Sequence, residues 1–212
     1  MVPSLQLQRP RLLVRPGEWE QLRSRARQEP RFAAIAGRVH RDADAILGAA
    51  PIKREIIGRR LLAESRRALH RLLTLSLTFH LTHESKYADR AAREMNAIAA
   101  FSDWNPSHFL DVAEMTLAMA IGYDWLHEQL SEATRAAART AILTKGVRVP
   151  LDTQHNRWTT MANNWGQVCH AGMVAGAIAV LEGDREAAVQ TIHRALANVP
   201  RSMAAFAPKG SY

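Results

Sequence analysis

Apolar residues recur along most of the chain at the three- and four-residue intervals of an amphipathic helix. After a break at residues 48–51 the pattern forms pairs, in which a long apolar segment, a short polar turn and a more polar segment follow one another. The predicted long helices cover residues 59–81, 107–127 and 164–181. The predicted return helices cover residues 86–100, 132–144 and 185–198, which indicates a repeated helical hairpin with a period of about 50 residues.

The part of the chain before these hairpins divides into two regions. Residues 1–15 hold short apolar runs between prolines and are predicted to be extended, whereas Pro16 and Pro30 each begin a predicted helix. Residues 16–207 show no alternating strand pattern. We therefore predict an all-α protein, with an N-terminal segment over residues 1–15 and one domain of packed helical hairpins over residues 16–212. The long helices are apolar nearly all round, which is typical of an inner layer.

Composition narrows the classes of protein and of site. The single cysteine, Cys169, excludes a disulfide framework and a Cys-rich zinc module, and we expect it in the core. The sequence contains neither a Gly-rich phosphate loop nor a His-Glu-x-x-His motif, so no cofactor and no metal are predicted. Runs of about 18 apolar residues, as a membrane span requires, are also missing.

The charge is basic, with 28 Lys and Arg against 20 Asp and Glu and a formal net charge of +8. Only four of the basic residues are lysines. Arginine binds carboxylate, sulfate and phosphate in a bidentate manner, so a polyanionic partner is one interpretation. Because the arginines are scattered along the chain, general solubility is the favoured explanation.

Polar residues that suit carbohydrate chemistry gather before the third long helix. Asn163, Asn164, Trp165 and Gln167 follow closely on one another, and His170 continues the same face. Neutral amides and an imidazole bind sugar hydroxyls and carboxyl groups. The alternative is structural, with Asn163 or Asn164 as an N-cap and His170 inside the bundle.

Four further regions carry candidate binding residues. Tyr123, Asp124 and Trp125 adjoin at the end of the second long helix, where aromatic rings could stack on sugars and the acid could accept their hydroxyls. The other aromatic and imidazole candidates lie in the connections between hairpins, where repeat proteins often build sites. They are Trp104, His155, Trp158 and Tyr212. For each region the alternative is a packed or capping role.

Taken in order, these segments resemble the N-terminal (α/α) toroid of the heparinase II/III-like polysaccharide lyases, which include oligoalginate lyases. The segments that carry the resemblance are Lys86-Tyr87-Ala88-Asp89-Arg90-Ala91, Asp103-Trp104-Asn105-Pro106-Ser107-His108-Phe109-Leu110-Asp111, Gly122-Tyr123-Asp124-Trp125, Asn163-Asn164-Trp165-Gly166-Gln167-Val168-Cys169 and Phe206-Ala207-Pro208-Lys209-Gly210-Ser211-Tyr212.

The resemblance implies β-elimination on a uronic acid within an acidic polysaccharide, such as a heparin-like or alginate-like chain, and no cofactor. It implies that Asn164 neutralises the uronate carboxylate. Some relatives have His where this chain has Trp165, so His155 and His170 are the imidazoles that could act as base by position. The catalytic Tyr of the family would lie beyond residue 212. We therefore expect an incomplete toroid, truncated at its C-terminal side and weakly active or inactive alone.

Two other functions stay open. A non-catalytic helical-repeat module could bind a polyanion or a protein, and a glycoside hydrolase on a similar toroid would need two carboxylates about 5–10 Å apart in a groove. Asp111, Glu114 and Asp124 are the acids near the motifs. The resemblance implies a periplasmic or secreted protein, but the first residues lack the apolar segment of a signal peptide, which leaves a cytoplasmic location as the alternative. Nucleic acid is not an expected partner, and the oligomeric state is not predicted.

Overall fold

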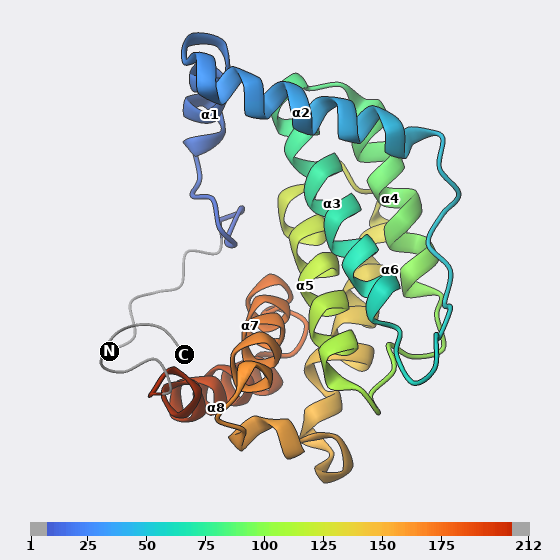
Figure 1. The fold of residues 1–212 in the computed structure, drawn as a ribbon, viewed down its shortest axis with the longest axis vertical. Coiled ribbons are helices and arrows are strands. Elements are labelled where there is room, and N and C mark those ends of the chain that lie inside the picture. Colours follow the sequence, from blue (N-terminus) through green and yellow to red (C-terminus); the bar gives the residue numbers. More distant parts are fainter. Residues whose placement is uncertain (1–7, 205–212) are drawn as a thin grey trace.

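A computed structural model describes residues 8–204, and its regular structure is helical (Figure 1). The helices are α1 (Glu18–Gln28), α2 (Pro30–Leu47), α3 (Leu62–Thr82), α4 (Ser85–Ala99), α5 (Phe109–Trp125), α6 (Glu132–Ile142), α7 (Asn164–Ala179) and α8 (Arg185–Met203). A π-helical turn, Leu143–Val147, and three short 3-10 turns between Val149 and Thr160 connect α6 to α7. The described residues contain no strand, so the all-α prediction is confirmed.

The three predicted hairpins are α3–α4, α5–α6 and α7–α8, and they lie side by side in Figure 1. The boundaries differ from the predicted ones by a few residues. The second return helix passes into the π-helical turn after Ile142, and α8 continues to Met203 with Pro200 inside its last turns. The closure of these hairpins into part of a toroid stays a prediction.

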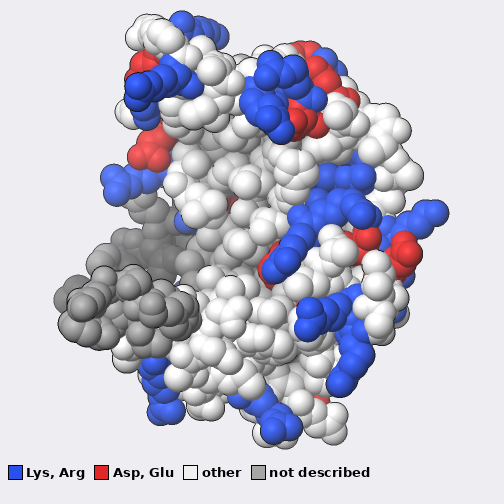
Figure 2. Space-filling view, in the orientation of Figure 1, with Lys and Arg blue, Asp and Glu red and all other residues white. Residues whose placement is uncertain are grey.

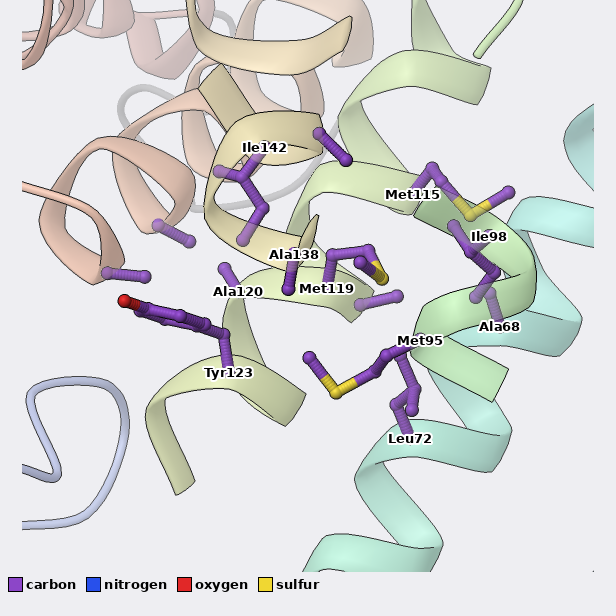
Figure 3. Close-up of a cluster of buried hydrophobic side chains, with 14 of the residues drawn as sticks. Ala68, Leu72, Met95, Ile98, Met115, Met119, Ala120, Tyr123, Ala138 and Ile142 are labelled. Atoms are coloured by element: carbon purple, nitrogen blue, oxygen red, sulfur yellow. The ribbon is translucent and has the colours of Figure 1, made fainter. Parts of the chain in front are cut away.

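Helices α3, α5 and α7 form the central layer, as their all-round apolar pattern predicts. In α5 every residue except Glu114 and Leu117 is buried. Figure 3 shows part of this core, to which Met95, Met115 and Met119 all contribute fully buried side chains. Cys169 is also fully buried, as expected. Small residues let α7 approach α5 closely, because a Cβ added to Gly172 would lie 2.2 Å from the backbone oxygen of Ala113.

The N-terminal strap, residues 9–12, joins the carboxyl ends of α5 and α7. Arg9 donates to Asp124 Oδ1 at 2.8 Å and to the carbonyl oxygen of Ala179 at 2.8 Å. The backbone amides of Arg11 and Leu12 donate to Asp124 Oδ2 at 2.7 and 2.9 Å. The two arginines supply positive charge where the helix dipoles are negative, so the strap stabilises both helix ends.

The ion pair between Glu182 and the strap should make the free energy of unfolding depend on pH in the acid range. The hydrogen bond from Arg11 lowers the pKa of the Glu182 carboxyl to about 2, from an ordinary 4.5. A carboxyl with a depressed pKa stabilises the folded state above its ordinary pKa, and this contribution is lost as pH falls toward 2. We expect Glu182→Gln to make urea-unfolding free energies less dependent on pH between about 4.5 and 2. An unchanged dependence would contradict this role.

The N-cap of α6 gives a second prediction. Ser131 accepts a hydrogen bond at 3.2 Å from the backbone N–H of Thr134, which makes it the side-chain cap of α6. We expect Ser131→Ala to cost about 1 kcal/mol in the free energy of unfolding, because that N–H loses its partner. Ser131→Asp should retain most of the stability. Equal losses in the two variants, measured by urea unfolding, would exclude the cap as the cause.

Charged side chains are spread over the surface. Figure 2 shows basic residues at several places on one face, with acidic residues beside some of them. Exposed pairs are local in sequence, such as Arg38–Asp42 within α2 and Arg25–Glu29 at the end of α1. On this face, the distribution favours the general solubility interpretation of the excess charge. None of the helices in the described ranges is both long and apolar enough to span a membrane.

Candidate functional site

The amino ends of the three central helices lie at one end of the molecule. Asp111, in the first turn of α5, accepts a hydrogen bond at 2.6 Å from the backbone N–H of Leu61, the residue before α3. His108, the residue before α5, contacts Trp165 in the first turn of α7 edge to face, with ring centroids 5.0 Å apart. These contacts define the amino-end site, which consists of His108, Asn163, Asn164, Trp165 and Gln167.

The amides of the amino-end site differ in what they do. Asn163 is the N-cap of α7, where its Oδ1 accepts from the backbone N–H of Trp165 at 3.0 Å. Gln167 is half-buried and donates to the carbonyl oxygen of Ser202 at 3.3 Å. The side-chain amide of Asn164 is exposed and makes no hydrogen bond to any residue in the range 8–204. Of the three amides, Asn164 is therefore the one free to bind a ligand.

The electrostatics of this end suit an anionic group. Helices α5 and α7 both begin here, and a helix amino end carries a partial positive charge, while the N–H of Trp165 in α7 is already satisfied by Asn163. A carboxylate placed beside Asn164 would meet the amide and the first turn of α7 together. The half-buried indole of Trp165 packs against the hydrophobic core and contacts His108 at this end.

An oriented imidazole is the feature that sequence analysis did not assign to the site. His108 Nδ1 lies 2.6 Å from Asp111 Oδ1, and because a carboxylate only accepts, Nδ1 carries the hydrogen. The Asp111 side chain is fully buried, whereas that of His108 is 15% exposed. The signal in the sequence was present but weak, since a His and an Asp three residues apart at a predicted helix start lie on one face.

Asn105 completes this arrangement from the connection before α5. Its Nδ2 donates to Asp111 Oδ2 at 2.7 Å and to the carbonyl oxygen of Arg59 at 2.9 Å, and its Oδ1 accepts from Ser107 at 2.8 Å. Asn105 is buried and has φ of 61°, a left-handed conformation that Asn tolerates better than most residues. The buried network fixes Asp111, and through it His108.

Comparison with known proteins gives no relative from which a function of this site could be inferred. No family model matches the chain, and no curated protein matches it. The function is therefore argued from the residues that the fold brings together.

The other residues predicted near Asn164 are mostly buried. His170 is 2% exposed, and its Nδ1–H donates to the carbonyl oxygen of Gly166 at 2.5 Å. Burial lowers the pKa of its imidazole, and its Nε2 is enclosed without a partner among the described residues. Trp158 packs between His170 and Phe109, with ring centroids 4.7 Å from each. Both side chains therefore lie beneath the surface of the site.

Trp104 and His155 have structural roles, because each takes part in a hydrogen bond that holds the surrounding backbone or a neighbouring ring. Trp104 is fully buried and donates through its indole N–H to the carbonyl oxygen of Ile98 at 3.3 Å. His155 is half-buried in a 3-10 turn, and its carbonyl oxygen accepts from the indole of Trp158 at 3.0 Å. Tyr212 lies outside the described residues.

Tyr123, Asp124 and Trp125, which are also candidate binding residues by sequence, lie at the other end of the central helices from Asn164. They close the carboxyl end of α5, about 24 Å along the helix from its first residue, whereas Asn164 lies at the amino end of α7. Asp124 is buried and fully engaged by the N-terminal strap. The indole of Trp125 donates to the carbonyl oxygen of Leu12, and Arg9 lies over the Tyr123 ring.

The acids near the motifs do not provide the pair that a glycoside hydrolase needs. Asp111 and Asp124 are each buried and hydrogen bonded at opposite ends of α5. Glu114 is paired with Arg66 at 3.2 Å. Within the described ranges, no three His, Cys, Asp or Glu side chains gather as a metal ion would require. Burial raises the pKa of the Cys169 thiol, which makes it a poor nucleophile.

Proposed function

We propose that the amino-end site binds a uronate residue of an acidic polysaccharide and that the protein belongs to the heparinase II/III-like lyases, which cleave by β-elimination. The observation that carries the proposal is the exposed, unengaged amide of Asn164 at the first residue of α7, beside an imidazole held by a buried carboxylate. The resemblance places the carboxylate-binding Asn at this same point, just before a central helix.

The chemistry explains why such an amide matters. In a 4-linked hexuronate the proton on C5 is adjacent to the carboxylate, and its removal adds negative charge to that carboxylate. Hydrogen-bond donors placed around the developing charge lower the barrier. Asn164 and the amino end of α7 supply such donors, and Trp165 supplies an aromatic ring for the sugar. The amino ends of the two parallel helices also favour an acidic substrate over a neutral one.

The variant Asn164→Ala tests this assignment. We expect it to weaken binding of a uronate oligosaccharide about tenfold or more, because it loses a hydrogen bond to a charged group. Calorimetric titration with an oligoalginate and with an unsulfated heparosan oligosaccharide would distinguish the two polymer classes. The matched control is Gln28→Ala, which removes an exposed amide on α1.

The same preparations should be assayed for ultraviolet absorbance of the unsaturated product. Binding that survives Asn164→Ala unchanged would overturn the placement of the carboxylate. If neither oligosaccharide binds the unaltered protein, the proposed function itself is wrong.

A further inference from the structure

We propose that His108 is the proton-transfer residue of the amino-end site and that Asp111 is its positioning residue. This inference rests on the proposed function and deepens it, because the resemblance leaves the base unidentified where Trp165 replaces a His.

The buried network leaves His108 with one nitrogen to use. Nδ1–H is committed to Asp111 at 2.6 Å, so the neutral ring carries its lone pair on Nε2. Nε2 makes no hydrogen bond to any residue between 8 and 204, and the side chain reaches the surface. A carboxylate that fixes one tautomer of an imidazole and stabilises its protonated form is the arrangement that general bases use.

The environment of Asp111 shows that its orientation is tightly set. Each of its oxygens has a partner, since Oδ1 accepts from His108 while Oδ2 accepts from the backbone N–H of Leu61 and from Asn105. The carboxylate therefore cannot rotate without breaking three hydrogen bonds. Capping α3 requires only the bond to Leu61, so the contact with His108 goes beyond what the helix end needs.

The position of His108 also suits the proposed substrate. Its ring touches that of Trp165, and Trp165 directly follows Asn164, with a Cα separation of about 3.8 Å between neighbouring residues. A uronate whose carboxylate binds Asn164 and whose ring lies on Trp165 would present C5 toward His108. The buried Nε2 of His170 has no such access, and no carboxylate within residues 8–204 is hydrogen bonded to the imidazole of His155.

The protons and electron pairs of the elimination balance with His108 as the group that both removes and returns the proton. His108 Nε2 takes the proton from C5, and the C5–H electron pair forms the C4=C5 double bond as the C4–O4 bond breaks. The leaving O4 takes the electron pair of that bond and accepts the proton from the imidazolium, so His108 returns to its neutral form. Asn164 meanwhile binds the carboxylate that carries the developing charge.

His108→Gln tests the proton-transfer role. We expect turnover to fall about a hundredfold or more while oligosaccharide binding changes less than twofold, because the lost group acts on the proton and not on the carboxylate. Added imidazole should restore part of the turnover in His108→Ala. The matched control, His193→Gln, alters an exposed His on α8 and should leave turnover unchanged.

Asp111→Asn tests positioning. The new amide can donate to Nδ1 and so select the wrong tautomer, so turnover should fall with KM unchanged. Nitrogen-15 NMR of the His108 ring should show the hydrogen on Nδ1 in the unaltered protein and on Nε2 in the variant. A merely structural role for Asp111 would not move the tautomer. The NMR measurement on the unaltered protein keeps the test valid if the variant does not fold.

The outcomes separate this inference from the proposed function. If the oligosaccharide binds in an Asn164-dependent way and His108→Gln keeps full turnover, His108 is excluded and the proposed function stands. If no uronate oligosaccharide binds, both are overturned. If the chain binds without turnover, a shift of the Nε2 resonance on binding supports the assignment, and an unmoved resonance overturns it.

Discussion

Asp124→Asn is expected to lower the free energy of unfolding by about 3–5 kcal/mol, the cost of removing one partner of a buried ion pair. Asp124 is fully buried and accepts three hydrogen bonds, from Arg9 and from the backbone amides of Arg11 and Leu12. The asparagine side chain would have the same shape but only one accepting oxygen. Its NH2 group would therefore face an N–H donor, either the Arg9 guanidinium or the backbone amides of Arg11 and Leu12. The Arg9 guanidinium would also lose its nearest opposite charge.

Urea unfolding followed by circular dichroism measures this effect, and the melting temperature should fall by roughly 10 °C. The control is Glu182→Gln, which removes the other acid of the strap. Its side chain is 49% exposed, so its ion pairs contribute no more than about 1 kcal/mol. If the two variants lost equal stability, or if Asp124→Asn lost none, the buried anchor would not hold the strap as described.

Gly172→Ala is expected to destabilise the protein by about 3 kcal/mol or more, at the upper end of overpacking costs. The new Cβ would lie 2.2 Å from the carbonyl oxygen of Ala113 and 2.9 Å from its Cα. Both atoms belong to the backbone of α5, so no side-chain rotation relieves the contact, and α7 must move away from α5.

A glycine-to-alanine substitution in α2 is instead expected to increase the free energy of unfolding. At Gly37 the nearest atom to an added Cβ is the end of the flexible Arg41 side chain, 3.7 Å away. Gly37→Ala should therefore gain up to about 1 kcal/mol from helix propensity. Urea unfolding of both variants measures the difference, and a neutral result at Gly172 would show that the contact between α5 and α7 is looser than the structure has it.

Hydrophobic periodicity was sufficient to predict the hairpins, because a helix needs only the residues within its own length to show its apolar face. The capping role of Asn163 followed for the same reason, since an N-cap acts on the next two or three residues. The extension of α8 through Pro200 was missed, because a Pro near a helix end is usually a stop signal.

The candidate site was harder to predict because it depends on which helix ends meet. Successive long helices of a hairpin array run parallel, so residues that end one helix, such as Asp124, lie far from residues that begin the next, such as Asn164. That inference was available from the hairpin pattern alone. The role of Asp111 was not, because its partner Leu61 lies 50 residues earlier in the chain and only the fold brings the two together.

The N-terminal strap has a consequence for the order of folding. Arg9 contacts residues 115 and 170 positions later in the chain, so its loop closes only after both α5 and α7 exist. Contacts of such long sequence separation form late, because the entropy of closing the loop precedes their benefit. Substitutions in the strap should therefore show φ-values near zero and act mainly by speeding unfolding. In a cell the strap would set how long the folded hairpins persist more than how quickly they form.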